Sequence, residues 1–240
     1  MDRGNRTLLV VDRSATHLFY MGTVLRRLEY TVRAAKSAED ALKSMAEALP
    51  ALVIMDTVLR AMNGIDLLKR MKQDQQLKTV PVIIHSSDDG PGVKERCMAA
   101  GCAAYFKKPA DIEMLYKAIQ AALEFAPRQT IRIETSLRVE VGDGTAPGGA
   151  VRQEYATALS EGGLYIKSLT PEPVNMVIPL KLFINDRVIR AAAVVLYSST
   201  KIGGQHKEPG MGMKFVTIST EDRAFVRDYI KEQISKGLPL

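Results

Sequence analysis

Short apolar runs alternate with amphipathic segments along the first half of the chain. Three nearly continuous apolar runs occupy residues 7–11, 51–55 and 80–86, and weaker ones occupy 31–35 and 103–107. Strands that are buried on both faces of a parallel sheet have this composition. The pattern therefore predicts five strands in the first half.

Helical periodicity fills the segments between these runs. Apolar residues recur at spacings of three and four over 18–28, 38–49 and 112–122, and Ser37 stands where it can cap the second of these helices. Five strands that alternate with five helices predict a doubly wound parallel α/β sheet of the flavodoxin-like (βα)5 class. We assign it to residues 1–125.

The second half follows a different pattern after Pro127, which should end the preceding helix. A loop is expected at 142–149, a two-residue hairpin turn at Asn185–Asp186, and a final helix capped by Thr220. Strand-like segments occupy 131–141, 164–169, 174–184, 187–198 and 210–218. Several strands at short spacing predict a small antiparallel β-barrel or sandwich with a C-terminal helix over residues 126–240.

Composition indicates an ordinary globular chain. It has 240 residues, of which 46% are hydrophobic and 25% charged. Its two cysteines, Cys97 and Cys102, are typical of buried thiols in a reducing compartment rather than of a disulfide framework. The N-terminal segment lacks the apolar run of a signal peptide, and no run reaches the roughly 20 residues that span a bilayer. We expect a cytoplasmic protein without a membrane partner.

The formal net charge of +6 could indicate a protein that binds nucleic acid. The positive excess is divided evenly between the two halves, and no helix-turn-helix pattern is present, so we expect no DNA binding. A glycine-rich phosphate loop and a Cys–His pairing are also missing, which argues against an enzyme built on the α/β half.

Polar residues follow the predicted parallel strands at their carboxyl ends. Asp12 follows the first, Asp56 the third, Ser86 ends the fourth, and Lys108 follows the fifth. The carboxyl ends of parallel strands meet at one edge of a doubly wound sheet, where such folds bind ligands. The sequence therefore predicts that two carboxylates, a hydroxyl and an ammonium group converge on one crevice.

These residues lie in segments that resemble two-component receiver domains over the whole first half: "LLVVDRS", "ALVIMDTVLRAMNGIDLLKRMK", "VPVIIHSS" and "AGCAAYFKKPA". The resemblance implies that Asp56 is the phosphoacceptor, Ser86 the switch hydroxyl and Tyr105 the switch aromatic residue. Lys108 matches the family's lysine, and Gly64 its turn glycine.

The resemblance also implies a mechanism and partners. Asp56 attacks an in-line phosphoryl group from a sensor histidine kinase, while Mg²⁺ and Lys108 neutralise charge on the transferring oxygens. The magnesium ligands implied are Asp12, Asp56 and the carbonyl group of Val58. Ser86 and Tyr105 then report the new phosphate to an unknown downstream protein.

One position departs from the receiver pattern. The family places two acidic residues together at the first strand end, and here the second is Arg13. We hypothesise that this guanidinium weakens magnesium binding and slows or abolishes phosphorylation; the alternative is that it points to solvent. Arg60 adds a second cation at the rim. His17 and His85 lack metal-ligand spacing, and His85 is interpreted as strand filler.

The second half carries an RxxxR pair, Arg128 and Arg132, and then Ser160, Gly162 and Gly163. Together with the final strand and helix, these residues resemble the PilZ domain over roughly residues 126–237. The resemblance implies a β-barrel that binds cyclic di-GMP, with the arginines on the phosphates and guanine and the small residues against the ligand.

Again one position departs, because Ala158 stands where the PilZ motif has Asp or Asn. The lost hydrogen bond would weaken cyclic di-GMP binding about tenfold to a hundredfold. The prediction is a bacterial regulator that relays signals through protein contacts, with motility or attachment implied by resemblance alone. The alternative is an adaptor whose two modules bind neither magnesium and phosphate nor the nucleotide. A homodimer is left open.

Overall fold

The computed structural model describes residues 6–124, 130–144, 150–200 and 208–238. The chain divides into two compact units, the second of which comprises Thr130–Ile234. The boundary predicted between residues 125 and 126 lies outside the described residues and stays a prediction. Each unit is considered by itself below.

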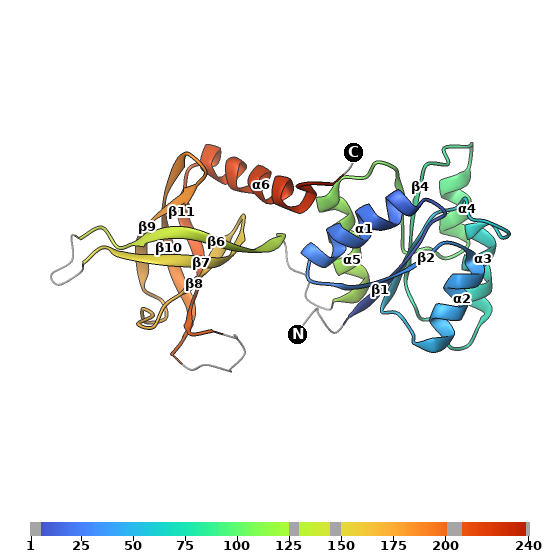
Figure 1. The fold of residues 1–240 in the computed structure, drawn as a ribbon, viewed down its shortest axis with the longest axis horizontal. Coiled ribbons are helices and arrows are strands. Elements are labelled where there is room, and N and C mark those ends of the chain that lie inside the picture. Colours follow the sequence, from blue (N-terminus) through green and yellow to red (C-terminus); the bar gives the residue numbers. More distant parts are fainter. Residues whose placement is uncertain (1–5, 125–129, 145–149, 201–207, 239–240) are drawn as a thin grey trace. The chain divides into compact units, whose positions relative to one another are not determined.

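The first unit contains a five-stranded parallel sheet in the order β2-β1-β3-β4-β5 (Figure 1). This order confirms the predicted flavodoxin-like class. The strands are β1 (Thr7–Val11), β2 (Thr31–Ala35), β3 (Leu52–Met55), β4 (Val82–Ser86) and β5 (Ala104–Lys107). The helices are α1 (Ala15–Arg27), α2 (Ala38–Glu47), α3 (Gly64–Gln73), α4 (Val93–Ala99) and α5 (Ile112–Leu123).

Helices cover both faces of this sheet, α1 and α5 on one and α2, α3 and α4 on the other. All residues of β3 and β4 are buried, as the continuous apolar runs predicted. Ser37 caps α2, since its hydroxyl group accepts a hydrogen bond of 3.1 Å from the amide of Asp40. Cys97 and Cys102 are free and buried.

The order of the strands positions the site. The chain leaves β1 toward β2 on one side, whereas β3 lies on the other side of β1. Neighbouring connections therefore run in opposite directions at the carboxyl ends of β1 and β3, which opens a crevice there. The two strands that precede Asp12 and Asp56 are the two that border this crevice.

The second unit is a closed antiparallel barrel with strand order β10-β11-β8-β7-β6-β9. Its strands are β6 (Arg132–Val141), β7 (Arg152–Ser160), β8 (Gly163–Lys167), β9 (Val177–Ile184), β10 (Arg187–Ser199) and β11 (Gly210–Ile218), followed by helix α6 (Thr220–Ser235). Ile184 and Arg187 are register partners, which confirms the two-residue turn at Asn185–Asp186. The barrel and the terminal helix confirm the predicted fold class.

One strand and one helix cap differ from the sequence prediction. Apolar and polar residues do not alternate regularly along strand β7 (RQEYATALS), whose register with β8 shifts between Ala156 and Ala158. At α6 the capping side chain belongs to Ser219 and not to Thr220, because the Ser219 hydroxyl group accepts a hydrogen bond of 3.0 Å from the amide of Asp222.

Among the described helices, none combines the length and the apolar composition that crossing a bilayer requires.

Candidate functional site

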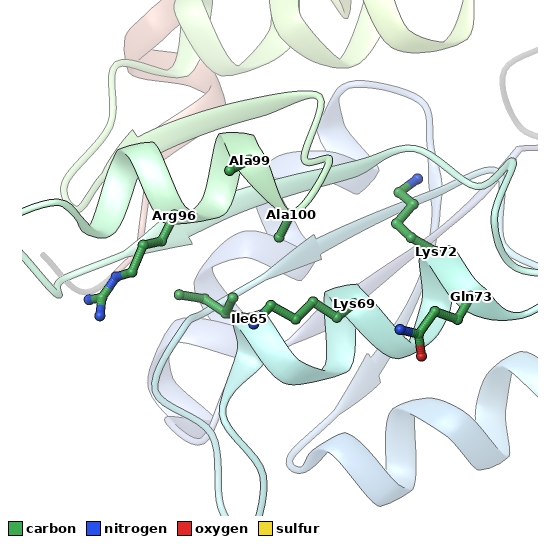
Figure 2. A pocket seen from close by; sticks show the side chains of 7 residues that line it. All are labelled: Ile65, Lys69, Lys72, Gln73, Arg96, Ala99 and Ala100. Carbon is green, nitrogen blue, oxygen red and sulfur yellow. The ribbon is translucent and has the colours of Figure 1, made fainter.

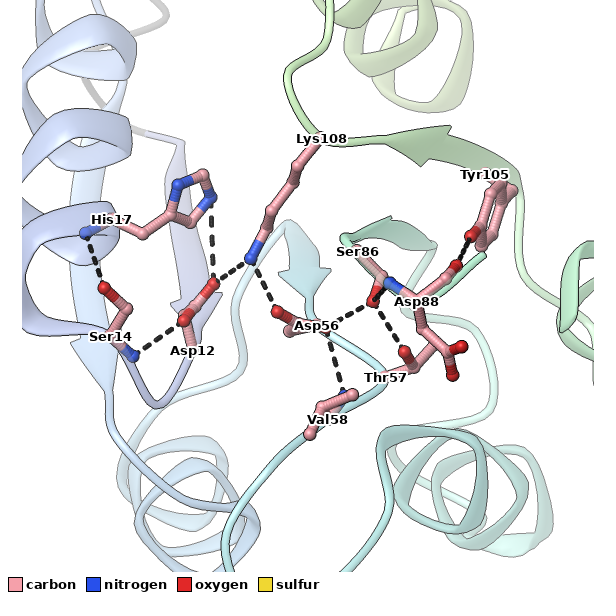
Figure 3. A network of polar contacts seen from close by, with 10 residues as sticks. All are labelled: Asp12, Ser14, His17, Asp56, Thr57, Val58, Ser86, Asp88, Tyr105 and Lys108. Carbon is pink, nitrogen blue, oxygen red and sulfur yellow. Dashed lines mark hydrogen bonds and ion pairs between the residues drawn. The ribbon is translucent and has the colours of Figure 1, made fainter. Parts of the chain in front are cut away.

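The polar residues at the carboxyl ends of the strands meet around the side chain of Lys108 (Figure 3). Its ammonium group donates a hydrogen bond of 2.6 Å to Asp56 Oδ2 and another to Asp12 Oδ2. Both aspartates are buried, with 2% of Asp12 and 7% of Asp56 exposed. One cation therefore bridges two buried carboxylates that lie 44 positions apart in sequence (56 − 12).

The second oxygen of Asp56 is also fully engaged. Asp56 Oδ1 accepts hydrogen bonds from the hydroxyl group of Ser86 and, at 3.0 Å, from the amide of Val58. Burial favours the neutral acid, but the hydrogen bonds from Lys108, Ser86 and Val58 outweigh it and lower the pKa of Asp56 below its usual value. The side chain is therefore an ionised carboxylate at neutral pH.

Asp12 is held by the start of α1. Its Oδ1 accepts a hydrogen bond of 2.7 Å from the amide of Ser14, and the Ser14 hydroxyl group in turn caps α1 by accepting from the amide of His17. His17 Nε2 lies 3.7 Å from Asp12 Oδ2. Burial and the charge of Lys108 lower the pKa of His17, against the opposing effect of Asp12 and Asp56, so His17 is neutral at pH 7.

His85 lies in β4 next to Ser86 and is only 4% exposed. Its ring centroid is 5.0 Å from that of His17, and neither of its ring nitrogens has a hydrogen-bond partner among the described residues. Burial, with the neighbouring His17 and Lys108, lowers the pKa of His85 to about 3. Its position agrees with the interpretation of His85 as strand filler.

Arg13 does not engage the two carboxylates. Its side chain is exposed, and within the described part of the chain it makes no hydrogen bond or ion pair. This geometry matches the alternative that Arg13 points to solvent, and the cation on Asp12 and Asp56 is Lys108 instead. Arg60 is exposed as well. The influence of Arg13 on magnesium binding stays a prediction, and it would arise from the charge of Arg13 rather than from a contact.

The oxygen atoms around Lys108 suit a hard cation. Magnesium takes one or two carboxylates and completes its shell with waters and phosphate oxygens, and Asp12 and Asp56 already converge on one cation. No cluster of three or more His, Cys, Asp or Glu side chains suited to a metal is found within the described ranges. A magnesium site here would thus rest on two carboxylates, with the Val58 carbonyl group as the third expected ligand.

Tyr105 and Gly64 shape the surroundings of Asp56. The hydroxyl group of Tyr105 donates a hydrogen bond of 2.6 Å to the carbonyl group of Asp88, and its ring packs against the core. A Cβ atom on Gly64 would lie 2.1 Å from the carbonyl oxygen of Asp56. Glycine is required there because the start of α3 packs directly on the Asp56 backbone.

The barrel brings the second set of predicted residues together. Arg132 in β6 is the register partner of Ser160 in β7, and Ser160 is the partner of Gly163 in β8. The Ser160 hydroxyl group donates a hydrogen bond of 3.0 Å to the carbonyl group of Gly163. A Cβ atom on Gly163 would lie 2.1 Å from the carbonyl oxygen of Met213, so only glycine fits. Arg128 lies outside the described residues.

The remaining motif positions are less constrained. Gly162 joins β7 to β8, and its carbonyl group accepts a hydrogen bond of 2.9 Å from the amide of Phe215. Ala158, at the position that departs from the PilZ motif, is half-buried and pairs with Glu134. Arg132 is half-buried as a residue, and its guanidinium group has no hydrogen bond or ion pair to any described residue.

Thr57 and Asp88 belong to the first site but were not singled out from the sequence. Thr57 Oγ1 lies 2.6 Å from Ser86 Oγ, and the amide of Asp88 donates to Ser86 Oγ at 3.2 Å. Their positions next to Asp56 and two residues after Ser86 are the only sequence signal. That signal was insufficient because the side chain of Thr57 could equally have faced another part of the core.

A separate hollow of about 430 Å³ lies between α3 and α4 and shares no residue with the carboxylate site (Figure 2). Its lining is formed by Ile65, Lys69, Lys72, Gln73, Arg96, Ala99 and Ala100. It contains three cationic side chains and no carboxylate, in contrast to the crevice around Lys108. Lys72 is anchored there, since its ammonium group donates to the carbonyl groups of Lys78 and Val80.

Comparison with known proteins places the first unit in a family. A model described as the response regulator receiver domain matches residues 8–120. The rice (Oryza sativa subsp. indica) two-component response regulator ORR3 is 32% identical over 103 residues, which cover 42% of this chain and 79% of that protein. Protein PilH of Pseudomonas aeruginosa is 29% identical over 116 residues, which cover 48% of this chain and 96% of PilH.

Among solved structures, the chemotaxis response regulator CheY4 of Vibrio cholerae has a TM-score of 0.46 and 25% identity, covering 49% of this chain and 98% of that one. The chain spans 49% of rice ORR7 and 62% of rice ORR6, two further relatives. The family match ends at residue 120 and does not include the barrel. Through residues 8–120, the chain belongs to the response regulator receiver family.

Proposed function

We propose that this protein is a signalling regulator in which Asp56 accepts a phosphoryl group from a sensor histidine kinase and the barrel is a PilZ-type output domain for cyclic di-GMP. The observation that carries the first part is the bridging of Asp12 and Asp56 by Lys108, beside a hydroxyl group on Asp56. A nucleophilic carboxylate, a second acid and a fixed cation are the groups that phosphoryl transfer to aspartate requires.

In this proposal a carboxylate oxygen of Asp56 attacks the phosphorus atom and the donor's leaving group departs on the opposite side. The depressed pKa of Asp56 keeps that oxygen unprotonated. Lys108 neutralises charge on the transferring oxygens, and the hydroxyl group of Ser86 donates a hydrogen bond to the bound phosphoryl group. Asp12, Asp56 and the Val58 carbonyl group would hold a magnesium ion, which would supply further positive charge beside the same oxygens.

For the barrel, the supporting observation is the juxtaposition of Arg132, Ser160 and Gly163 on three adjacent strands. Arg132 is half-buried, and a guanidinium group that has no partner among the described residues can bind a phosphate as a fork and stack on a purine. Arg128 is the second arginine of the proposed grip. Because Ala158 offers no polar side chain to a base, we propose weakened rather than absent binding of cyclic di-GMP.

A second candidate function is an adaptor that uses both units for protein contact alone. Arg13 and Ala158 favour it, because each replaces a polar ligand at the position where the family motif has one. Lys108 already forms an ion pair with each of the two carboxylates without a metal. This adaptor binds neither magnesium nor cyclic di-GMP.

Incubation of the full chain with acetyl phosphate and magnesium, followed by intact mass spectrometry, distinguishes the two functions. We expect wild type to gain one phosphoryl group and Asp56→Asn to gain none. Asp66→Asn, on the exposed side of α3, is the matched control and should behave as wild type. A wild-type mass that does not change would favour the adaptor.

A further inference from the structure

The hydroxyl group of Ser86 has all of its hydrogen-bonding capacity filled. A serine hydroxyl has one proton and two acceptor positions. The proton goes to Asp56 Oδ1, since an ionised carboxylate can only accept. The amide of Asp88 donates to Ser86 Oγ at 3.2 Å. Because Ser86 has no second proton, the hydroxyl group of Thr57, whose Oγ1 lies 2.6 Å from Ser86 Oγ, must be the donor in that contact.

The contact with Ser86 is also what satisfies the hydroxyl group of Thr57. Thr57 is completely buried, and among the residues that the structure describes its hydroxyl group has no second hydrogen-bond partner. A buried hydroxyl group that loses its acceptor is destabilised, because water cannot replace the lost bond. Any movement of Ser86 Oγ away from Thr57 is therefore unfavourable in free energy, because it leaves the Thr57 hydroxyl group without an acceptor.

We propose that Thr57 is a positioning residue that holds the Ser86 hydroxyl group on Asp56 and thereby opposes its transfer to a phosphoryl group. This inference rests on the proposed role of Asp56 as phosphoacceptor. The threonine biases the switch toward its unphosphorylated arrangement, and its effect passes entirely through Ser86.

The first test measures the Ser86 side chain in the unphosphorylated full chain. Three-bond Hα–Hβ couplings of Ser86 should report one rotamer in wild type and in Thr57→Ser, which keeps the hydroxyl group. In Thr57→Val, which keeps the shape and loses the hydroxyl, the couplings should be averaged over rotamers. A single unchanged rotamer in Thr57→Val would overturn the proposal, and this result does not depend on phosphorylation.

The second test uses beryllofluoride with magnesium as a mimic of the phosphoryl group, titrated by NMR. We expect Thr57→Val to bind about tenfold more tightly than wild type, and Thr57→Ser to stay within about twofold. In a Ser86→Ala background, Thr57→Val should change the affinity by less than about twofold, because the contact is already lost. Equal affinities of wild type and Thr57→Val would overturn the proposal.

Failure of the proposed function gives a different pattern. If wild type bound no beryllofluoride, the phosphoacceptor role of Asp56 would be refuted, while the Ser86 couplings would still decide whether Thr57 fixes this hydroxyl group. Chemical denaturation of each variant checks that the first unit remains folded.

Discussion

Lys108 Nζ lies 2.6 Å from Asp56 Oδ2, and the same ammonium group also donates to Asp12. The side chain of Lys108 is 14% exposed, and those of the two aspartates are 3% and 8% exposed. A single cation therefore bridges two buried carboxylates and offsets only part of their combined negative charge. Buried charges of this kind are destabilising as soon as their partner is removed.

Replacing Lys108 with alanine should lower the free energy of unfolding by about 3 kcal/mol at pH 7, because two carboxylates would remain buried without a cation. The matched control is Lys107→Ala, which removes an exposed ion pair with Asp89 and should cost less than about 1 kcal/mol. Urea denaturation measures both. Equal losses of unfolding free energy in the two variants would show that the contact of Lys108 with the two carboxylates stabilises the fold no more than an exposed ion pair does.

We expect Arg13 to act on magnesium binding through its charge, because it is exposed and contacts neither Asp12 nor Asp56. Arg13→Asp should tighten magnesium binding about tenfold, because it adds a carboxylate beside Asp12 and removes a nearby cation. Arg26→Asp on α1 is also exposed and changes the net charge equally, so it controls for long-range electrostatics. Calorimetric titration with magnesium gives the affinities. The hypothesis fails if Arg13→Asp and Arg26→Asp bind magnesium alike.

His85 makes the stability of the first unit depend on pH. The unfolded chain protonates this histidine near pH 6.5, whereas in the folded state its pKa is lowered to about 3. Between these values the unfolded state binds more protons, so stability falls as pH falls from 6.5, by at most about 1.4 kcal/mol per pH unit. His85→Leu should flatten this dependence. Urea denaturation of both proteins at pH 4 to 7 would contradict the account if the slopes were identical.

Arg132 should dominate nucleotide binding by the barrel. If the proposed cyclic di-GMP site exists, Arg132→Ala should weaken binding at least about tenfold, because a charge-assisted fork to phosphate is lost. Arg223 and Arg227 in α6 have the same RxxxR spacing, and Arg227 is exposed, so Arg227→Ala is the matched control and should leave affinity unchanged. Calorimetry on the full chain decides. An absence of heat from folded wild type would favour the adaptor, and equal effects of the two substitutions would place the ligand elsewhere.

The fold was largely predictable because burial has a simple signature in sequence. Apolar runs such as 51–55 belong to strands that are buried on both faces. The convergence of parallel strand ends on one edge of the sheet also predicts that Asp12, Asp56 and Lys108 meet. Strand β7 was not predicted, because a register shift at Ala156–Ala158 interrupts the alternation of apolar and polar residues on which strand prediction relies.

Side-chain direction limited the prediction of the site. The sequence placed Arg13 next to Asp12 but could not tell that its guanidinium group is exposed. It likewise gave no reason to connect Thr57, in the loop after β3, with Ser86 at the end of β4, 29 residues further along the chain. Such contacts depend on packing around each side chain, which the periodicity of a single chain does not encode.

The central claim is that Asp56 is the residue that carries the phosphoryl group. The most direct measurement is to treat the full chain with acetyl phosphate and magnesium, reduce the acyl phosphate with borohydride to homoserine, and map the modified peptide by tandem mass spectrometry. The account predicts homoserine at position 56 in wild type and more of it in Arg13→Asp. Homoserine at another aspartate, or none in either protein, would contradict it.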